Sequence, residues 1–381
     1  MNAVRQGDDH AATDGALATL GTLFANAGYA PVTTPHLFEA DTLIDLYGED
    51  IRGRAFLFPG AGGGNELCLR PDFTVPVVRA HGANGWDRAA RYGYQGPVFR
   101  RQPPGATRPM EYLQSGIENL GDPDAATADA QVFALTLQGL GDLGAGPLAI
   151  TTGDLSIAFA LLDALAMPAH RRHQLRRHFW RPQRFHQLIA QAVAGPTAPT
   201  PLRARLIAAA DDPTAIAAIA AQAGEPLGLR EIDEIAARTS ALANAATQPP
   251  MPAEQAELIE SALSINGPAG SALARLRALT HAGGTDITPA LDRFEARLTA
   301  LDHAGIDAAN LPFDAAFGRK LEYYEGFVFE ITAQGRPDLP PLSGGGRYDA
   351  MTRRLGATRA IPAVGAMIRP EAVLAMREGP Q

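Results

Sequence analysis

The chain has 381 residues, 46% of them hydrophobic, which is enough for a large buried core and favours two domains. Its 33 basic and 41 acidic residues give a net charge of −8, which argues against general attraction to nucleic acid or anionic membranes. The single cysteine, Cys68, excludes an intramolecular disulfide and a cysteine-only metal site, and no secretory signal opens the chain. We therefore expect a soluble, globular, cytoplasmic protein.

The first part of the chain predicts helices and strands without a regular βαβ alternation. Apolar residues recur at helical spacing over 14–27, and Gly28 is placed to end that helix. The segment 29–40 predicts a strand at an edge or an interface, because its two prolines cannot donate to a ladder. A strand pair around a glycine loop follows over 54–74, then a helix, then a strand hairpin over 93–121.

The rest of the chain divides by composition. After a further helix, strand and helix, residues 168–310 are rich in alanine, leucine and arginine and predict a helical insertion or subdomain. Strand character returns over 311–381. We therefore predict an α+β fold, an antiparallel sheet flanked by helices, with 1–167 and 311–381 forming one core.

The second strand of the hairpin, MEYLQSGIENL, has an unusual face. Tyr112, Gln114, Gly116 and Glu118 share one side, because residues two apart in a strand point the same way. An amide, a missing side chain and a carboxylate suit a small polar ligand, with Glu118 as acceptor for an ammonium or imidazole N–H. The alternative is a solvent-facing strand surface.

Two further segments offer ligand-binding side chains. Arg100 ends the preceding strand and is suited to holding a carboxylate or phosphate bidentately, although a solvated surface arginine is the alternative. The segment FGRKLEYYEGFVFE contains Arg319, Tyr323 and Tyr324 and predicts a pocket wall that hydrogen-bonds a heterocycle. Ordinary aromatic packing at a strand start is the alternative.

The other motifs are less specific. The glycine loops at 60–65 and 343–349 are neither a P-loop nor a dinucleotide fingerprint, but the second would allow a ligand to approach the backbone closely. The segment 170–188 concentrates arginine, histidine and aromatic residues, which fits contact with RNA, a nucleotide or an acidic surface, or a solvated helix face. The spacing supports no metal site and no Ser-His-Asp or Cys-His arrangement.

Taken in order, these segments resemble the catalytic core of histidyl-tRNA synthetases. The resemblance lies in GYAPVTTPHLFEA, LRPDFT, GPVFR, YLQSGIENLG, GRKLEYYEGFVFE, GGGRYD and IPAVGA, over roughly 15–166 and 311–376. It implies a class II synthetase fold that dimerises, and no motif of it covers the helical middle. The residues that match the family's histidine pocket are Asp72, Thr74, Arg100, Gln114, Glu118, Arg319, Tyr323 and Tyr324.

The nucleotide side departs from the synthetase pattern. Gln102 and Pro103 stand where the family has a glutamate and an arginine, and Ala372 stands where an arginine grips the γ-phosphate. Losing such a charge-assisted contact removes about 1.5–3 kcal/mol. Arg369, one turn earlier, is no obvious replacement. The sequence ends nine residues after Ala372, and we therefore expect no anticodon-binding domain.

A retained pocket with a lost nucleotide side resembles the regulatory subunits of ATP phosphoribosyltransferase. The resemblance implies a non-catalytic chain, without cofactor or metal, that dimerises and assembles with a short-form catalytic subunit. It also implies feedback control by histidine in the first step of histidine biosynthesis. Two alternatives remain: a truncated synthetase that forms an aminoacyl adenylate, and a module that senses histidine or uncharged tRNA.

Overall fold

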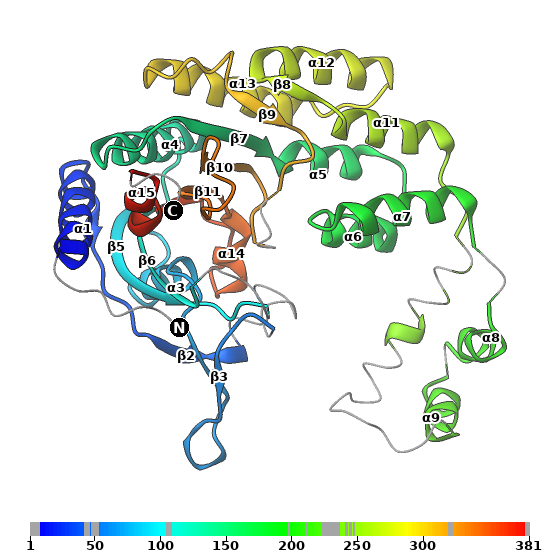
Figure 1. The fold of residues 1–381 in the computed structure, drawn as a ribbon. Coiled ribbons are helices and arrows are strands. Elements are labelled where there is room, and N and C mark those ends of the chain that lie inside the picture. The colour runs from blue at the N-terminus through cyan, green and yellow to red at the C-terminus, as the bar shows by residue number, and fades with distance from the viewer. Residues whose placement is uncertain are drawn as a thin grey trace. The chain divides into compact units, whose positions relative to one another are not determined.

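The computed structural model describes most of the chain as two compact units. The described residues are 8–41, 46, 53–103, 109–196, 199–210, 212–222, 237–240, 243, 246, 248–318 and 323–377. Within them, the first unit comprises the residues up to Ala158, Ala262–Ala282 and those from Ile287 onward. The second comprises Phe159–Ser261 and Gly283–Asp286 (Figure 1).

A mostly antiparallel sheet forms the centre of the first unit. Its strands, in spatial order, are β1 (Ala30–Pro31), β5 (Ala90–Phe99), β6 (Glu111–Leu120), β12 (Ala363–Ile368), β11 (Ser343–Arg347), β10 (Phe327–Ala333), β7 (Leu148–Asp154), β9 (Pro312–Asp314) and β8 (Asn266–Pro268). Among the described residues, only the β1–β5 and β7–β9 pairs are parallel. A smaller sheet contains β2 (Leu37–Glu39), β4 (Leu67–Leu69) and β3 (Leu57–Phe58).

These strands confirm the predicted antiparallel sheet, but the single strand expected over 29–40 is two short strands, β1 and β2, in different sheets. β1, with Pro31, lies at the sheet edge, as expected for a strand that cannot donate at every residue. β3 and β4 pair around the glycine loop, where Ala61–Gly63 form a 3₁₀ turn, η2. Cys68 is buried in β4 as a free thiol.

The helices of the first unit cover this sheet. They are α1 (Asp8–Asn26), α3 (Thr74–Ala83), α4 (Ala125–Asp142), α12 (Ala269–Ala282), α13 (Thr288–His303), α14 (Asp349–Arg354) and α15 (Pro370–Arg377), with α5 (Leu155–Ala164) leaving it. α4 begins at a side-chain cap, where Asp124 accepts from the Thr127 N–H at 3.0 Å. Phe133 of α4 then packs edge-on against Phe329 of β10, with ring centroids 4.8 Å apart, which places α4 on the sheet.

The predicted helical segment, 168–310, is divided between the two units. α6 (Ala169–His178), α7 (Pro182–Ala194), α8 (Pro201–Ala208), α9 (Pro213–Gln222) and α11 (Ala253–Leu263) belong largely to the second unit. α12 and α13 instead pack with the sheet, where Phe294 stacks on Phe313 of β9 at 4.7 Å. Helical periodicity identifies such helices but carries no information on which of them contact a distant strand.

A buried arginine fixes the segment LRPDFT beside the β5–β6 hairpin. The Arg70 guanidinium donates to the carbonyl oxygens of Pro97 and Thr34, both at 2.8 Å, and lies 4.0 Å from the Phe73 ring centroid. The Phe73 ring in turn stacks on Tyr94 of β5 at 4.5 Å. These contacts set the position of the residues on either side of Phe73, Asp72 and Thr74.

Candidate functional site: a polar pocket on the large sheet

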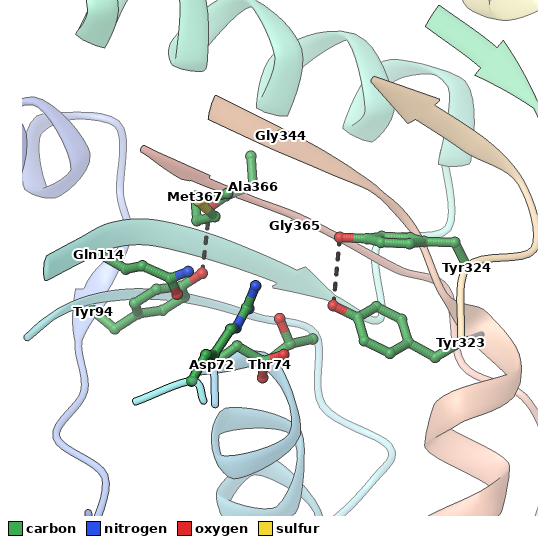
Figure 2. A pocket seen from close by; sticks show the side chains of 11 residues that line it. Asp72, Thr74, Tyr94, Gln114, Tyr323, Tyr324, Gly344, Gly365, Ala366 and Met367 are labelled. Carbon is green, nitrogen blue, oxygen red and sulfur yellow. Dashed lines mark hydrogen bonds between the residues drawn. The ribbon is translucent and has the colours of Figure 1, made fainter. Parts of the chain in front are cut away.

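A pocket with about 310 Å³ of empty space, including the part open to solvent, lies where β5, β6, β11 and β12 meet the start of α3. Six of the eight residues assigned to the histidine pocket line it: Asp72, Thr74, Arg100, Gln114, Tyr323 and Tyr324. Figure 2 shows Asp72, Thr74, Gln114 and the two tyrosines around a common space. Arg319 and its neighbour Glu322 lie outside the described residues.

The amide of Gln114 is the most informative group in this pocket. The side chain is 1% exposed, and neither its oxygen nor its nitrogen has a hydrogen-bond partner among the described residues. Leaving a buried polar group unsatisfied costs about 1–3 kcal/mol. Such a cost at a pocket wall is typical of a group that a ligand satisfies. The solvent-facing alternative for this strand face is therefore excluded.

Glu118 lies in the wall behind the pocket and is not part of its lining. Thr74 Oγ1 donates to Glu118 Oε1 at 2.8 Å, and the Tyr348 hydroxyl donates to Oε2. Burial raises the pKa of the Glu118 carboxyl from 4.5 to about 8, against the opposing effect of these two hydrogen bonds. In the ligand-free protein, the Glu118 carboxyl group behind the pocket therefore keeps its proton near neutral pH.

This pKa predicts a pH dependence of stability that a single variant removes. The folded protein keeps the Glu118 proton up to about pH 8, whereas the unfolded chain loses it near pH 4.5. The contribution of Glu118 to stability is thus fully present below pH 4.5 and is lost as pH rises to about 8, by at most about 1.4 kcal/mol per pH unit. Urea unfolding at pH 5, 6.5 and 8 should show this loss in the wild type relative to Glu118→Gln. Parallel curves for the two proteins would contradict the assignment.

Arg100 lines the pocket directly after the end of β5. Its Nε donates to the Pro71 carbonyl oxygen at 2.8 Å, and its guanidinium carbon lies 5.8 Å from the Tyr112 ring centroid. Arg369 approaches the same ring at 5.4 Å. The guanidinium presents its N–H donors in a planar fork, a geometry that suits a carboxylate.

The two tyrosines of the predicted pocket wall are both buried, and both line the cavity. Their hydroxyl oxygens lie 3.5 Å apart, and their ring centroids lie 4.5 Å apart (Figure 2). Both rings also contact Tyr348, at 5.8 and 6.5 Å. Both interpretations of these tyrosines therefore hold, since the two rings pack against each other and also line the pocket.

The pocket also contains residues that the sequence did not single out individually. Tyr94, Gly365, Ala366 and Met367 line it, and the Tyr94 hydroxyl donates to the Ala366 carbonyl oxygen at 3.5 Å (Figure 2). Gly344 comes from the GGG run, for which a close backbone approach was predicted. The signal for Gly365 was present in IPAVGA, but the pairing of Gly365 with Glu118 depends on the register of β12 against β6.

The positions that differ from the synthetase pattern have other roles in this fold. Ala372 is buried in α15 with 6% exposure, and Glu371 accepts the backbone N–H of Leu113 at 2.8 Å. Arg369 donates to the Pro341 carbonyl oxygen, and Gln102 donates to that of Pro109 at 3.2 Å. These residues therefore tie α15 and the hairpin to the surrounding backbone.

The described part of the chain contains neither a metal-binding cluster nor a membrane-spanning helix. No group of three or more His, Cys, Asp or Glu side chains could hold a metal ion. No described helix is both long and apolar enough to cross a bilayer.

The known proteins most informative about this chain are regulatory subunits and synthetases. The family model of histidyl-tRNA synthetases matches residues 8–244 and 216–373. The ATP phosphoribosyltransferase regulatory subunit of Allorhizobium ampelinum is 36% identical, with 90% of this chain and 92% of that protein covered. The regulatory subunit of Brucella anthropi is 38% identical, with 88% of this chain and 89% of that protein covered. The regulatory subunit of Mesorhizobium japonicum is 34% identical, with 95% of this chain and 97% of that protein covered.

Solved structures show the same fold at lower identity. An ATP phosphoribosyltransferase regulatory subunit/histidyl-tRNA synthetase from Bacillus halodurans aligns with a TM-score of 0.71 at 20% identity, covering 99% of this chain and 82% of that one. Histidyl-tRNA synthetase from Nostoc sp. PCC 7120 aligns with a TM-score of 0.61 at 17% identity, covering 98% and 75%. The resemblance and the fold class read from the sequence are thus confirmed. The chain belongs to the family of ATP phosphoribosyltransferase regulatory subunits, which carries the histidyl-tRNA synthetase fold.

Proposed function

We propose that this chain is the non-catalytic regulatory partner of a short-form ATP phosphoribosyltransferase catalytic subunit in the cytoplasm. Its relatedness to named regulatory subunits over about nine-tenths of both chains carries this proposal. The chain would act as a dimer within a hetero-oligomer, activating the catalytic subunit in the first step of histidine biosynthesis and transmitting feedback inhibition by histidine.

Histidine is the ligand that we assign to the pocket on the large sheet. Arg100 would hold its carboxylate and Asp72 its ammonium, because each offers the opposite charge at the lining. The Gln114 amide and the hydroxyls of Tyr323 and Tyr324 would bind the imidazole ring, which offers both a donor and an acceptor. Arg319 keeps the role that the family resemblance implies for it, whereas Glu118 would act from behind the lining, through its hydrogen bond with Thr74. The unsatisfied amide of Gln114 is the strongest support for a polar ligand.

Control of a partner requires the pocket to differ between two states of the complex. Histidine would shift the catalytic subunit toward an inhibited state only if it binds that state more tightly. The coupling is reciprocal, so the catalytic subunit should change the affinity of this chain for histidine by the same factor.

Assembly can be tested by mixing the two purified proteins on gel filtration. The proposal predicts co-elution in a complex larger than either protein alone. Independent elution at micromolar concentrations of both proteins would contradict it.

The Gln114 assignment predicts opposite effects on stability and on ligand binding. Gln114→Leu removes a desolvated amide that lacks partners, so we expect the ligand-free protein to gain about 1 kcal/mol in free energy of unfolding. The same change should weaken histidine binding at least about tenfold, because the ligand loses its amide partner. Urea unfolding and titration calorimetry measure the two effects.

Gln131→Leu is the matched control for this prediction. Gln131 is an exposed glutamine of α4 that accepts from Arg91 at 3.2 Å, away from the pocket. The Gln131→Leu variant should leave the affinity for histidine unchanged. Unchanged affinity in Gln114→Leu as well would place the histidine site elsewhere.

A further inference from the structure

The second unit contains a cavity that the proposed function does not use. Its walls come from α6, α7 and α8 together with Arg238, Ala246 and Gln248. The space that water-sized molecules can occupy in it is about 590 Å³, within the roughly 300–1,000 Å³ of ordinary small-molecule pockets. Part of the basic segment predicted at 170–188 lies on these walls.

The cavity concentrates positive charge without compensation. Arg171, Arg184, Arg203 and Arg238 line it, and its described lining includes no Asp or Glu. Of the described side chains, no carboxylate forms an ion pair with any of these four arginines. The contacts that are present are neutral: Arg171 donates to the Pro249 carbonyl oxygen at 3.0 Å, and Arg184 donates to the Gln187 side chain at 2.6 Å.

Other basic side chains of the segment contact carboxylates outside the cavity lining. Arg176 pairs with Asp163 at 2.8 Å and lies 4.5 Å from the Phe159 ring centroid. His186 contacts Glu260 at 2.8 Å. Four arginines without an ion pair to any described carboxylate therefore share one concave surface of a chain with net charge −8, and the electric field of such a cleft attracts anions.

The walls also offer an apolar surface and a neutral acceptor. Leu175 and Leu188 line the cavity beside the arginines. Gln248 lines it too, and its amide nitrogen contacts His170 Nδ1 at 2.8 Å. Its amide oxygen is buried and has no hydrogen-bond partner within the described residues. A ligand that fits has several negative charges, an apolar part and a hydroxyl or amine donor.

We propose that this cavity binds an organic polyphosphate, with its phosphate groups among the four arginines. Arginine suits this role because its planar N–H groups can bind phosphate oxygens in pairs. A concave site with an apolar wall favours a small phosphorylated molecule over the extended backbone of an RNA strand. The site is separate from the histidine pocket, since all of its described residues belong to the second unit.

Titration of the full-length chain with ATP and with inorganic tripolyphosphate tests this proposal. Both should bind the wild type, and Arg184→Ala and Arg203→Ala should each weaken binding about tenfold or more. Arg177→Ala is the matched control, because Arg177 is an exposed arginine of α6 that does not line the cavity. It should change either affinity less than about twofold.

Three results would overturn the proposal. One is the absence of ATP and tripolyphosphate binding at millimolar concentration. Another is equal weakening by the control and the cavity variants. The third is tight binding of a short RNA hairpin that tripolyphosphate does not displace, which would identify an RNA surface instead. Histidine binding, measured in the same variants, should be unchanged and reports on the proposed regulatory site independently.

Discussion

Replacing Gly365 by alanine is expected to destabilise the first unit and abolish histidine binding. A Cβ at this position would overlap the Glu118 carboxyl group, lying 2.5 Å from its Cδ and 2.8 Å from the Ile117 carbonyl oxygen. Glu118 cannot move away freely, because Thr74 and Tyr348 hold both of its oxygens. Such overpacking typically costs about 1–3 kcal/mol, and the backbone contact places this site at the upper end.

The clash predicts a specific rescue. In the double variant Gly365→Ala/Glu118→Ala the shortened side chain leaves space for the new methyl group, so thermal stability should recover at least in part. Gly15→Ala is the matched control, because an added Cβ there meets nothing within 4 Å on the exposed side of α1. The Gly15→Ala variant should raise the free energy of unfolding by about 0.5–1 kcal/mol. Normal stability of Gly365→Ala would show that the β6–β12 register is wrong.

Asp129→Ala is expected to cost about 3–5 kcal/mol, because it breaks a buried charge network. Arg347 Nη2 lies 2.7 Å from Asp129 Oδ1, and Arg297 Nη1 lies 3.6 Å from Oδ2. Arg297 Nη2 also lies 2.6 Å from Asp154 Oδ2. All four side chains are buried, so the variant leaves two arginines inside the protein with fewer partners.

This network joins α4, β11, α13 and β7, so its loss should affect the whole first unit. Arg277→Ala provides the comparison, since Arg277 of α12 pairs with Asp292 at 2.9 Å and with Glu295 at 2.8 Å, all three at the surface. An exposed pair contributes less than about 1 kcal/mol. Urea unfolding followed by near-ultraviolet circular dichroism measures both variants. A loss below about 1 kcal/mol in Asp129→Ala would contradict the network's role.

Local sequence patterns indicated several strands and part of the pocket lining, but not β8, which lies within the segment 168–310 that was expected to be helical. The period-two pattern of MEYLQSGIENL placed Gln114 and Glu118 on one face, Arg100 was expected at the end of the preceding strand, and the family resemblance added Asp72 and Thr74. Burial on that face depends on β12 and on α3, which lie far away in sequence. For this reason the sequence alone left a solvent-facing surface open as an alternative.

Contacts between distant segments account for what the sequence could not predict. Tyr348 reaches Glu118 across 230 positions in the chain, and no local pattern marks it as part of the site. Glu118 was expected to face the ligand, yet Thr74 and Tyr348 place it behind the pocket lining. The helical periodicity of α13 gave no indication that its Arg297 pairs with Asp154 of β7.

The regulatory role itself is tested most directly by reconstituted activity. A short-form catalytic subunit of ATP phosphoribosyltransferase would be assayed for phosphoribosyl-ATP formation alone, with this chain, and with this chain plus histidine. We predict little activity alone, strong activation by the chain, and inhibition by histidine that Gln114→Leu weakens at least about tenfold. Full activity of the catalytic subunit without this chain, or no response to histidine in the complex, would contradict the proposed function.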